Sequence, residues 1–210
     1  MLIKRIVCDI PTESRSDFDR AQRSWHALAT VPGLVSQFGG FAVDKAHILS
    51  LWRDDDSYHA FMSSAHDRVT NQNIQHQHYV AINVELFSEE LAMPGSSCSS
   101  IIEALPKAGL LRIADCHVSP PRREHFVQVQ REMWHPAMAA WGMLAGTFAH
   151  AKSRPNRYLV ASLWQTAATH QAYVSGALPA LRGEAKPEID LERLSGELIE
   201  LEPAWTVLPK

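Results

Sequence analysis

The chain has 210 residues, of which 46% are hydrophobic and 20% are charged, and its formal net charge is −3. A folded chain of this length buries about 70% of the surface that its unfolded form exposes, so a sizeable core is available. This composition is that of a globular protein and excludes a wholly disordered chain. Lys and Arg are scattered and form no basic stripe, which argues against a nucleic-acid partner.

The sequence gives no sign of a membrane or secretory segment. The first residues lack the continuous apolar stretch of a secretory signal, and no run of about 18 apolar residues occurs. The three cysteines, Cys8, Cys98 and Cys116, are odd in number and show no CxxC spacing. This pattern argues against a disulfide framework and a zinc site. We therefore expect a cytoplasmic protein with no membrane contact.

The first elements alternate between strand and helix. A strand is predicted over residues 3–10 and ends at a proline. Apolar residues then recur at helical spacing and predict an amphipathic helix that Pro32 and Gly33 end; these residues are Phe18, Ala21, Trp25, Leu28 and Ala29. Further strands are predicted over residues 34–38 and 47–52, with Gly39 and Gly40 breaking the pattern between them.

A second helix and a closing strand complete this unit. The helix begins near Ser57, where Asp54, Asp55 and Asp56 supply N-cap candidates and acidic residues that the helix dipole favours. Alternation over residues 84–87 predicts the closing strand. The unit therefore reads βαββαβ.

The second half of the chain repeats this pattern. Matching segments keep their order and nearly constant spacing, which makes a duplication the simplest explanation. The matches are Phe18, Gln22 and Trp25-His26 with Phe126, Gln130 and Trp134-His135; Leu34 and Phe38 with Leu144 and Phe148; Ser50-Leu51-Trp52 with Ser162-Leu163-Trp164; and Tyr58 and Phe61 with His170 and Tyr173. We expect a first repeat over residues 1–88, a Ser- and Pro-rich linker over 89–108 and a second repeat over 109–210.

The predicted third strands are apolar at nearly every position. Ile48, Ser50 and Trp52 face one way, and Leu49 and Leu51 face the other. Both faces of each sheet must then be covered, and two copies in one chain can do this by packing their sheets together. We predict an α+β fold in which two ferredoxin-like repeats form an α/β barrel within one chain. Such a chain is a monomeric pseudo-dimer or a homodimer.

Several motifs resemble a known superfamily. The order helix, Pro32-Gly33-Leu34, strand, Gly39-Gly40, Ser50-Leu51-Trp52 and an aromatic-bearing helix resembles the antibiotic-biosynthesis-monooxygenase-like dimeric α/β barrel proteins. With Gln37 and His66-Asp67, the first half is most similar to the YdbC-like proteins, a family of uncharacterised function. The superfamily resemblance implies cofactor-independent oxygenases of quinols and polyketides, heme-degrading enzymes, chlorite dismutase-like proteins, or members without known activity.

The heme-degrading pattern is not met. That pattern has an Asn on the first strand and a Trp with a His on the second helix, whereas this sequence has Cys8-Asp9 on the first strand and Phe61 on the helix. We therefore expect no cofactor. The many histidines include His59 and His66, but no Cys or carboxylate set accompanies them at ligand spacing, so we expect no metal site.

Aromatic and amide side chains are the candidates for substrate binding. Gln22 lies on the apolar stripe of the first helix, where its amide must meet a protein group, trapped water or a ligand. Trp25 and Trp52 supply flat surfaces between helix and sheet and serve as core or as pocket walls. With Phe61 and Gln37, they form the predicted substrate-binding set.

His66 and Asp67 are the candidates for catalysis. A carboxylate-oriented His can act as a general base, although a His at the end of a helix also has a purely stabilising role. The leading hypothesis is a cofactor-independent oxygenase-like enzyme for a small aromatic or quinol-like substrate. The alternative is a non-catalytic protein that binds a small molecule or a partner, with heme binding as a third option.

Overall fold

The computed structural model describes residues 1–64, 66 and 74–210. Both halves follow the predicted order of strands and helices. The strands are β1 (Leu2–Asp9), β2 (Leu34–Ala42), β3 (Lys45–Trp52), β4 (Ala81–Pro94), β5 (Leu110–Val118), β6 (Met143–Ala151), β7 (Arg157–Trp164) and β8 (Leu191–Leu201). The helices are α1 (Arg15–Arg23), α2 (Asp55–Ser64), α4 (Ile101–Ala104), α5 (Arg123–Val129), α6 (His135–Ala140), α7 (Ala167–Gly176), α8 (Leu178–Ala185) and α9 (Pro187–Asp190).

The chain divides into two compact units. The first unit contains Met1–Leu86 and Ile199–Lys210, and the second contains Phe87–Leu198. The closing strands β4 and β8 thus each contribute residues to both units. The hydrogen-bonded strand order is β1-β3-β2-β8-β5-β7-β6-β4, a closed barrel. This topology confirms the predicted α+β class and the antiparallel barrel.

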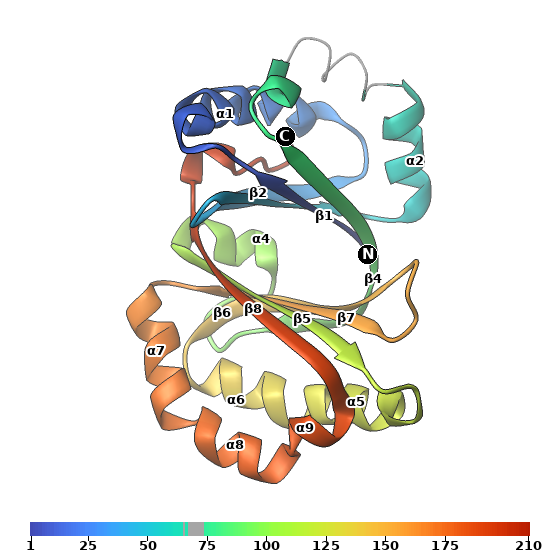
Figure 1. Cartoon of the computed structure of the whole chain (residues 1–210), viewed down its shortest axis with the longest axis vertical. Coiled ribbons are helices and arrows are strands. Elements are labelled where there is room, and N and C mark those ends of the chain that lie inside the picture. The colour runs from blue at the N-terminus through green and yellow to red at the C-terminus, as the bar shows by residue number, and fades with distance from the viewer. Residues whose placement is uncertain (65, 67–73) are drawn as a thin grey trace. The chain divides into compact units, whose positions relative to one another are not determined.

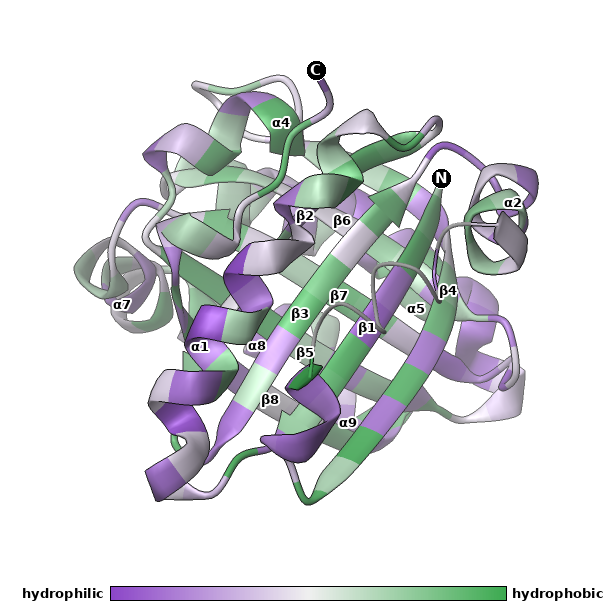
Figure 2. Ribbon diagram, turned by 90° about the horizontal axis from the view of Figure 1, so that it is seen from above, coloured by the Kyte–Doolittle hydropathy of each residue, from purple (hydrophilic) through white to green (hydrophobic). Residues whose placement is uncertain are grey.

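The sheet of the first unit has β3 at its centre. β3 pairs antiparallel with β1 and with β2, so that Trp52 lies opposite both Leu2 and Leu34. The helices α1 and α2 lie on one face of this sheet (Figures 1 and 2). Ile48, Ser50 and Trp52 point to that face, as predicted, because side chains alternate along a strand.

The second unit repeats this arrangement around β7. Trp164 lies opposite Leu110 of β5 and Met143 of β6, and β4 pairs with β6. The indole N–H of Trp164 donates to the Ser162 hydroxyl at 3.0 Å, and Trp52 makes the same bond to Ser50 at 3.1 Å. The Ser-Leu-Trp match is thus a structural repeat in which the serine satisfies a buried indole N–H.

The predicted break at Gly39 and Gly40 is wrong. β2 continues through both glycines to Ala42, and the chain turns at Val43, whose φ is +51°. A Cβ at Gly39 would collide with the carbonyl oxygen of His47, and one at Gly40 would collide with that of Glu200. The two glycines therefore allow close approach of neighbouring strands inside the sheet and do not form a turn.

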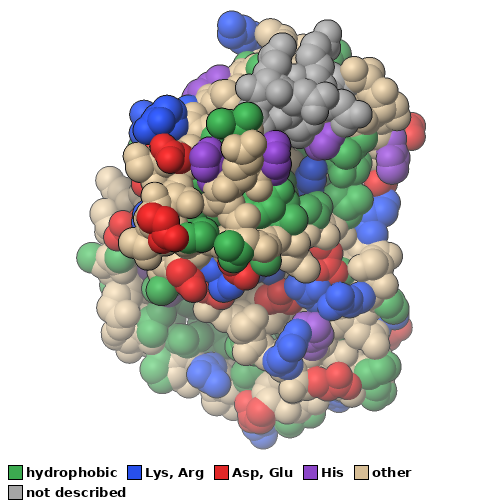
Figure 3. All heavy atoms as spheres, turned by 45° about the horizontal axis from the view of Figure 1, so that its top comes forward, with side chains coloured by type: hydrophobic (Ala, Val, Ile, Leu, Met, Phe, Trp, Pro, Cys, Tyr) green, Lys and Arg blue, Asp and Glu red, His purple; other side chains and the backbone are tan. Residues whose placement is uncertain are grey.

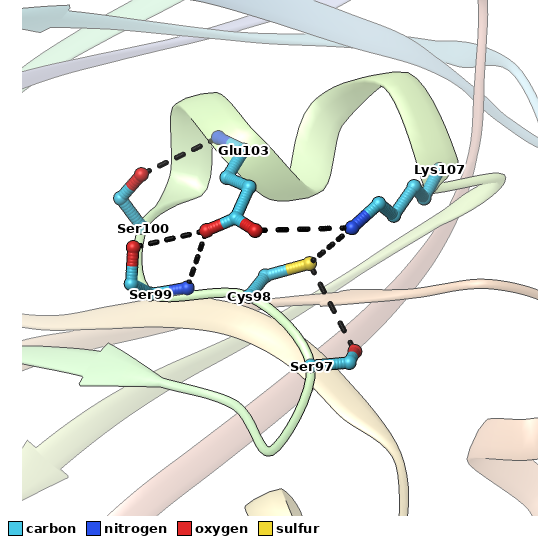
Figure 4. Close-up of polar contacts among 6 residues, drawn as sticks. All are labelled: Ser97, Cys98, Ser99, Ser100, Glu103 and Lys107. Atoms are coloured by element: carbon cyan, nitrogen blue, oxygen red, sulfur yellow. Dashed lines mark hydrogen bonds and ion pairs between the residues drawn. The ribbon is translucent and has the colours of Figure 1, made fainter.

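The expected linker, residues 89–108, carries regular structure. It holds the second part of β4 and the short helix α4, whose first turn is capped by Ser100 (Figure 4). The Glu103 carboxylate accepts from the Ser99 backbone N–H at 2.8 Å and from its hydroxyl at 2.9 Å. Lys107 donates to the buried Cys98 sulfur at 3.4 Å. These contacts give the polar serine run a defined fold.

Candidate functional site

A cavity of about 390 Å³ lies within the first unit, between its helices and the face of its sheet that they cover. Six of the seven predicted site residues line it, and these are Gln22, Trp25, Gln37, Trp52, Phe61 and His66. The seventh, Asp67, lies outside the described residues. The structure therefore brings together side chains of α1, β2, β3, α2 and the segment after α2, and the first and last of them, Gln22 and His66, are 44 positions apart in the sequence.

Aromatic side chains make one wall of the cavity. The rings of Trp52 and Phe61 stack with centroids 4.9 Å apart and an interplanar angle of 24°. The His66 ring meets Phe61 edge-on at 5.7 Å and lies 6.4 Å from the ring of half-buried Trp25. Trp52 is 1% exposed and so serves both as core and as cavity wall. His66 thus stands within reach of a ligand that stacks on this wall.

A chain of hydrogen bonds links Trp25, Gln75 and Gln22. The Trp25 indole N–H donates to Gln75 Oε1 at 2.8 Å, and Gln75 Nε2 donates to Gln22 Oε1 at 2.7 Å. Gln22 is 3% exposed, and the sequence left open whether its amide meets protein or ligand. Its oxygen meets protein. Gln75 was not among the predicted site residues, although it belongs to a stretch rich in amide and histidine side chains.

The floor of the cavity carries a polar row. Lys4 of β1 lies opposite Ser50 of β3, which lies opposite Gln37 of β2. The Lys4 ammonium is 5.6 Å from the centroid of the Tyr58 ring, and burial lowers its pKa. Sequence reasoning missed Lys4. The available signal was a basic residue at a strand position in phase with Leu2, Ile6 and Cys8, which share its face.

Burial favours the neutral forms of three further groups in the cavity, Cys8, Tyr58 and Tyr79. Burial, and then the charge of Asp9, raise the pKa of the Cys8 thiol to about 12. Burial also raises the pKa of the Tyr58 and Tyr79 phenols, and the charge of a Cys8 thiolate would raise the pKa of Tyr79 further. Because the thiolate is the reactive form of cysteine, Cys8 at neutral pH packs as an apolar group and does not act as a nucleophile.

The corresponding region of the second unit is packed by side chains. Trp164 stacks on Tyr173 at 5.5 Å, and the amide of Gln130 donates to the Met93 sulfur at 3.4 Å. Leu178 and Leu181 pack against the same cluster. This unit also has an open groove of about 750 Å³, lined largely by the charged and polar residues of α5 and its flanks. That groove lacks the buried aromatic wall of the first-unit cavity, so we place the candidate site in the first unit.

Hydrophobic and histidine side chains reach the surface of the first unit. Ile74, Ile82 and Val84 are exposed, and Ile82, Val84 and exposed His76 line the cavity. Figure 3 shows several histidines among hydrophobic side chains on this face. The cavity is thus bordered by apolar surface, which suits an aromatic ligand.

Two findings concern metals and membranes. Among the described residues, no group of three or more His, Cys, Asp or Glu side chains is placed to hold a metal ion. No helix in the same part of the chain is long and apolar enough to cross a membrane.

The fold is shared with solved structures of other proteins. The structure is similar to a putative monooxygenase from Lactobacillus acidophilus NCFM, with a TM-score of 0.75 and 11% identity over 99% of this chain and 95% of that one. It is also similar to a putative monooxygenase from Fusobacterium nucleatum, with a TM-score of 0.79 and 7% identity over 95% and 91% of the two chains. The chain therefore has the fold of antibiotic-biosynthesis-monooxygenase-like proteins.

Sequence similarity gives the family. Residues 2–87 match the family described as a domain of unknown function, DUF4937. The chain is 32% identical over 95 residues to the uncharacterised protein YdbC of Bacillus subtilis, a match that covers 43% of this chain and 80% of that protein. The chain belongs to this YdbC-like family, and the matched residues include every predicted site residue.

Proposed function

We propose that the chain is an oxygenase-like enzyme that acts on a small aromatic or quinol-like molecule in the first-unit cavity, without a tightly bound cofactor. The observation that carries the proposal is the aromatic wall of Trp25, Trp52 and Phe61, with the His66 imidazole against two of these rings. A cavity of about 390 Å³ suits a small planar ligand, since small-molecule sites span about 300 to 1,000 Å³. The fold shared with putative monooxygenases supports the same class.

In the proposed reaction, His66 removes a proton from the substrate and leaves an electron-rich carbanion or phenolate. This anion passes one electron to dioxygen, and the resulting superoxide and substrate radical combine to a peroxide. The peroxide loses water and leaves a carbonyl. One oxygen atom stays in the product, and the other leaves as water with two hydrogens of the substrate: the proton that His66 removes and one hydrogen from the carbon that becomes the carbonyl. The protein supplies positioning, a dry site and proton removal.

The partner of His66 is the part of this proposal that rests on sequence alone. Asp67 follows His66 directly and is proposed to orient its imidazole. Neutral imidazole is the form that accepts a proton, so the proposed role uses His66 in that form.

Oxygen uptake tests the proposal. Wild type and His66→Ala are assayed with anthrones and substituted hydroquinones in an oxygen electrode. Loss of a general base lowers the rate by about 10²- to 10⁴-fold, and we expect a decrease in this range. His59→Ala is the matched control, because His59 is an exposed histidine of α2. Unchanged uptake in His66→Ala for every active substrate would remove the base from the mechanism.

Two other outcomes would replace the proposal. If wild type binds these compounds and consumes no oxygen, the cavity belongs to a non-catalytic binding protein. If added hemin gives a saturable Soret band that competes with the aromatic probes, the ligand is heme.

A further inference from the structure

The helix-covered face of the first sheet carries one polar row between apolar rows. The polar row is Lys4, Ser50 and Gln37, which are cross-strand neighbours. On one side lies the row of Leu2, Trp52 and Leu34, and on the other the row of Ile6, Ile48 and Gly39. Ser50 already accepts the Trp52 indole N–H. The two ends of the row, Lys4 and Gln37, carry hydrogen-bond donors and line the cavity.

Gln37 presents an unmet hydrogen-bond donor. The residue is 4% exposed, and its Nε2 has no hydrogen-bond partner among the described residues. A buried polar group left in this state costs about 1 to 3 kcal/mol. Native proteins satisfy nearly all such groups, and an acceptor in the cavity that Gln37 lines would satisfy this amide.

Lys4 presents a cation without a counterion. Among the described residues, no carboxylate forms an ion pair with its ammonium, whose near neighbour is the face of the Tyr58 ring. Burial disfavours its charge, and no acidic group offsets this effect. Buried charges in proteins are normally paired, and an anionic ligand oxygen would supply the missing charge.

We propose that the Lys4–Gln37 row binds the ionised oxygen of a planar aromatic anion, such as a phenolate or an enolate. Lys4 compensates the charge, Gln37 donates a hydrogen bond to the same oxygen or to its neighbour, and Trp52 and Phe61 hold the ring. The inference rests on the proposed function in one respect only: the anion held there is the species that reacts with dioxygen. Binding itself is measurable without turnover.

The second unit lacks this pair of donors. Arg112 takes the position of Lys4 opposite Ser162, but Gly146 takes the position of Gln37. The cation is kept and the amide is absent there. The anion site is therefore assigned to the first unit alone, and Arg112 offers a matched control for Lys4.

The test uses 4-nitrophenol, whose phenolate absorbs at longer wavelength than the phenol. An opposite charge at about 4–6 Å lowers a pKa by about 1 to 3 units, so binding is expected to shift the apparent pKa of the probe downward by this amount. Lys4→Met is expected to abolish the shift and weaken phenolate binding at least about tenfold, whereas Lys4→Arg keeps most of the shift. Gln37→Met weakens binding and keeps the shift, and Arg112→Met changes neither.

Two results would overturn the inference. One is that the Lys4→Met variant binds the phenolate with wild-type affinity while it unfolds at the same temperature as the wild type. The other is equal affinity of the wild type for 4-nitroanisole, the neutral ether. Oxygen uptake separates the two proposals: probe binding on Lys4 without uptake by any substrate defeats the oxygenase and leaves the anion site, whereas uptake unchanged in Lys4→Met defeats the anion site and leaves the oxygenase.

Discussion

The hydrogen-bonded pair Gln22–Gln75 allows a quantitative prediction about the rim of the cavity. Gln22 comes from α1 and Gln75 from the turn Ile74–Gln77, more than 50 residues further along the chain. Methionine matches glutamine in length and removes its amide, so the perturbations are Gln22→Met, Gln75→Met and the double variant. Their free energies of unfolding form a double-mutant cycle.

The expected magnitudes follow from burial. Gln75→Met strands the oxygen of Gln22, which is 3% exposed, and the indole N–H of Trp25. An unsatisfied buried group costs about 1 to 3 kcal/mol, so the loss should fall near the upper end of this range. Gln22→Met removes one acceptor from half-buried Gln75, to which water has access, and should cost about 1 kcal/mol. In the double variant, Gln22 no longer has an oxygen to strand, so the total is expected to fall short of the sum by about 1 kcal/mol or more.

Urea unfolding followed by circular dichroism measures these differences, with the exposed Gln171→Met of α7 as a control for the substitution itself. Losses that add within about 0.5 kcal/mol would show that the two amides act independently and would refute the reasoning. Equal losses in the two single variants would refute the role of burial.

Further predictions concern the buried polar groups of the two sheets. His47 is 2% exposed, and burial, with smaller contributions from Arg5 and Lys45, lowers its pKa to about 4. Because His47 in the unfolded chain takes up its proton at about pH 6.5, the folded state loses on the order of 3 kcal/mol of stability as the pH falls from about 6.5 to 4. His47→Gln should flatten this part of the pH profile of the free energy of unfolding, measured with urea. An unchanged acid slope in that variant would assign the loss to other groups. Ser162→Ala and Ser50→Ala should each cost about 1 to 3 kcal/mol, because each leaves the indole N–H of a fully buried tryptophan, Trp164 or Trp52, without its acceptor. An unchanged urea midpoint in either variant would contradict the role of that serine as the acceptor of the buried indole.

The fold was predictable from the sequence because the determinants are local patterns repeated twice. Each element has its own local signal: the helical spacing of Phe18 and its neighbours predicts a helix, Pro32-Gly33 predicts its end, and Ser-Leu-Trp marks the end of a strand. Matching segments recur in the second half of the chain and support these predictions. The position of the two glycines inside a strand was harder to predict. Gly39 and Gly40 have the composition of a turn, and only the neighbouring backbone of His47 and Glu200 shows that they permit close strand approach.

The candidate site was predictable in its aromatic residues and less so in its polar ones. Trp25, Trp52 and Phe61 follow from the rule that large flat side chains fill the space between helix and sheet. The contact of Gln22 with Gln75 depends on the path of a segment with no regular pattern. Lys4 lies in a strand that is covered on both faces, so the sequence does not show which groups surround its side chain. Its neighbours in the sheet, Ser50 and Gln37, follow only from the strand register.

The central claim is that the first-unit cavity binds a single aromatic anion. Isothermal titration of 4-nitrophenolate into wild type and Met62→Trp tests it most directly, because half-buried Met62 lines the cavity and a larger side chain there would fill it. We predict one bound anion per chain for the wild type and no detectable binding to Met62→Trp. Undiminished binding to a folded Met62→Trp protein would place the ligand elsewhere and contradict the claim.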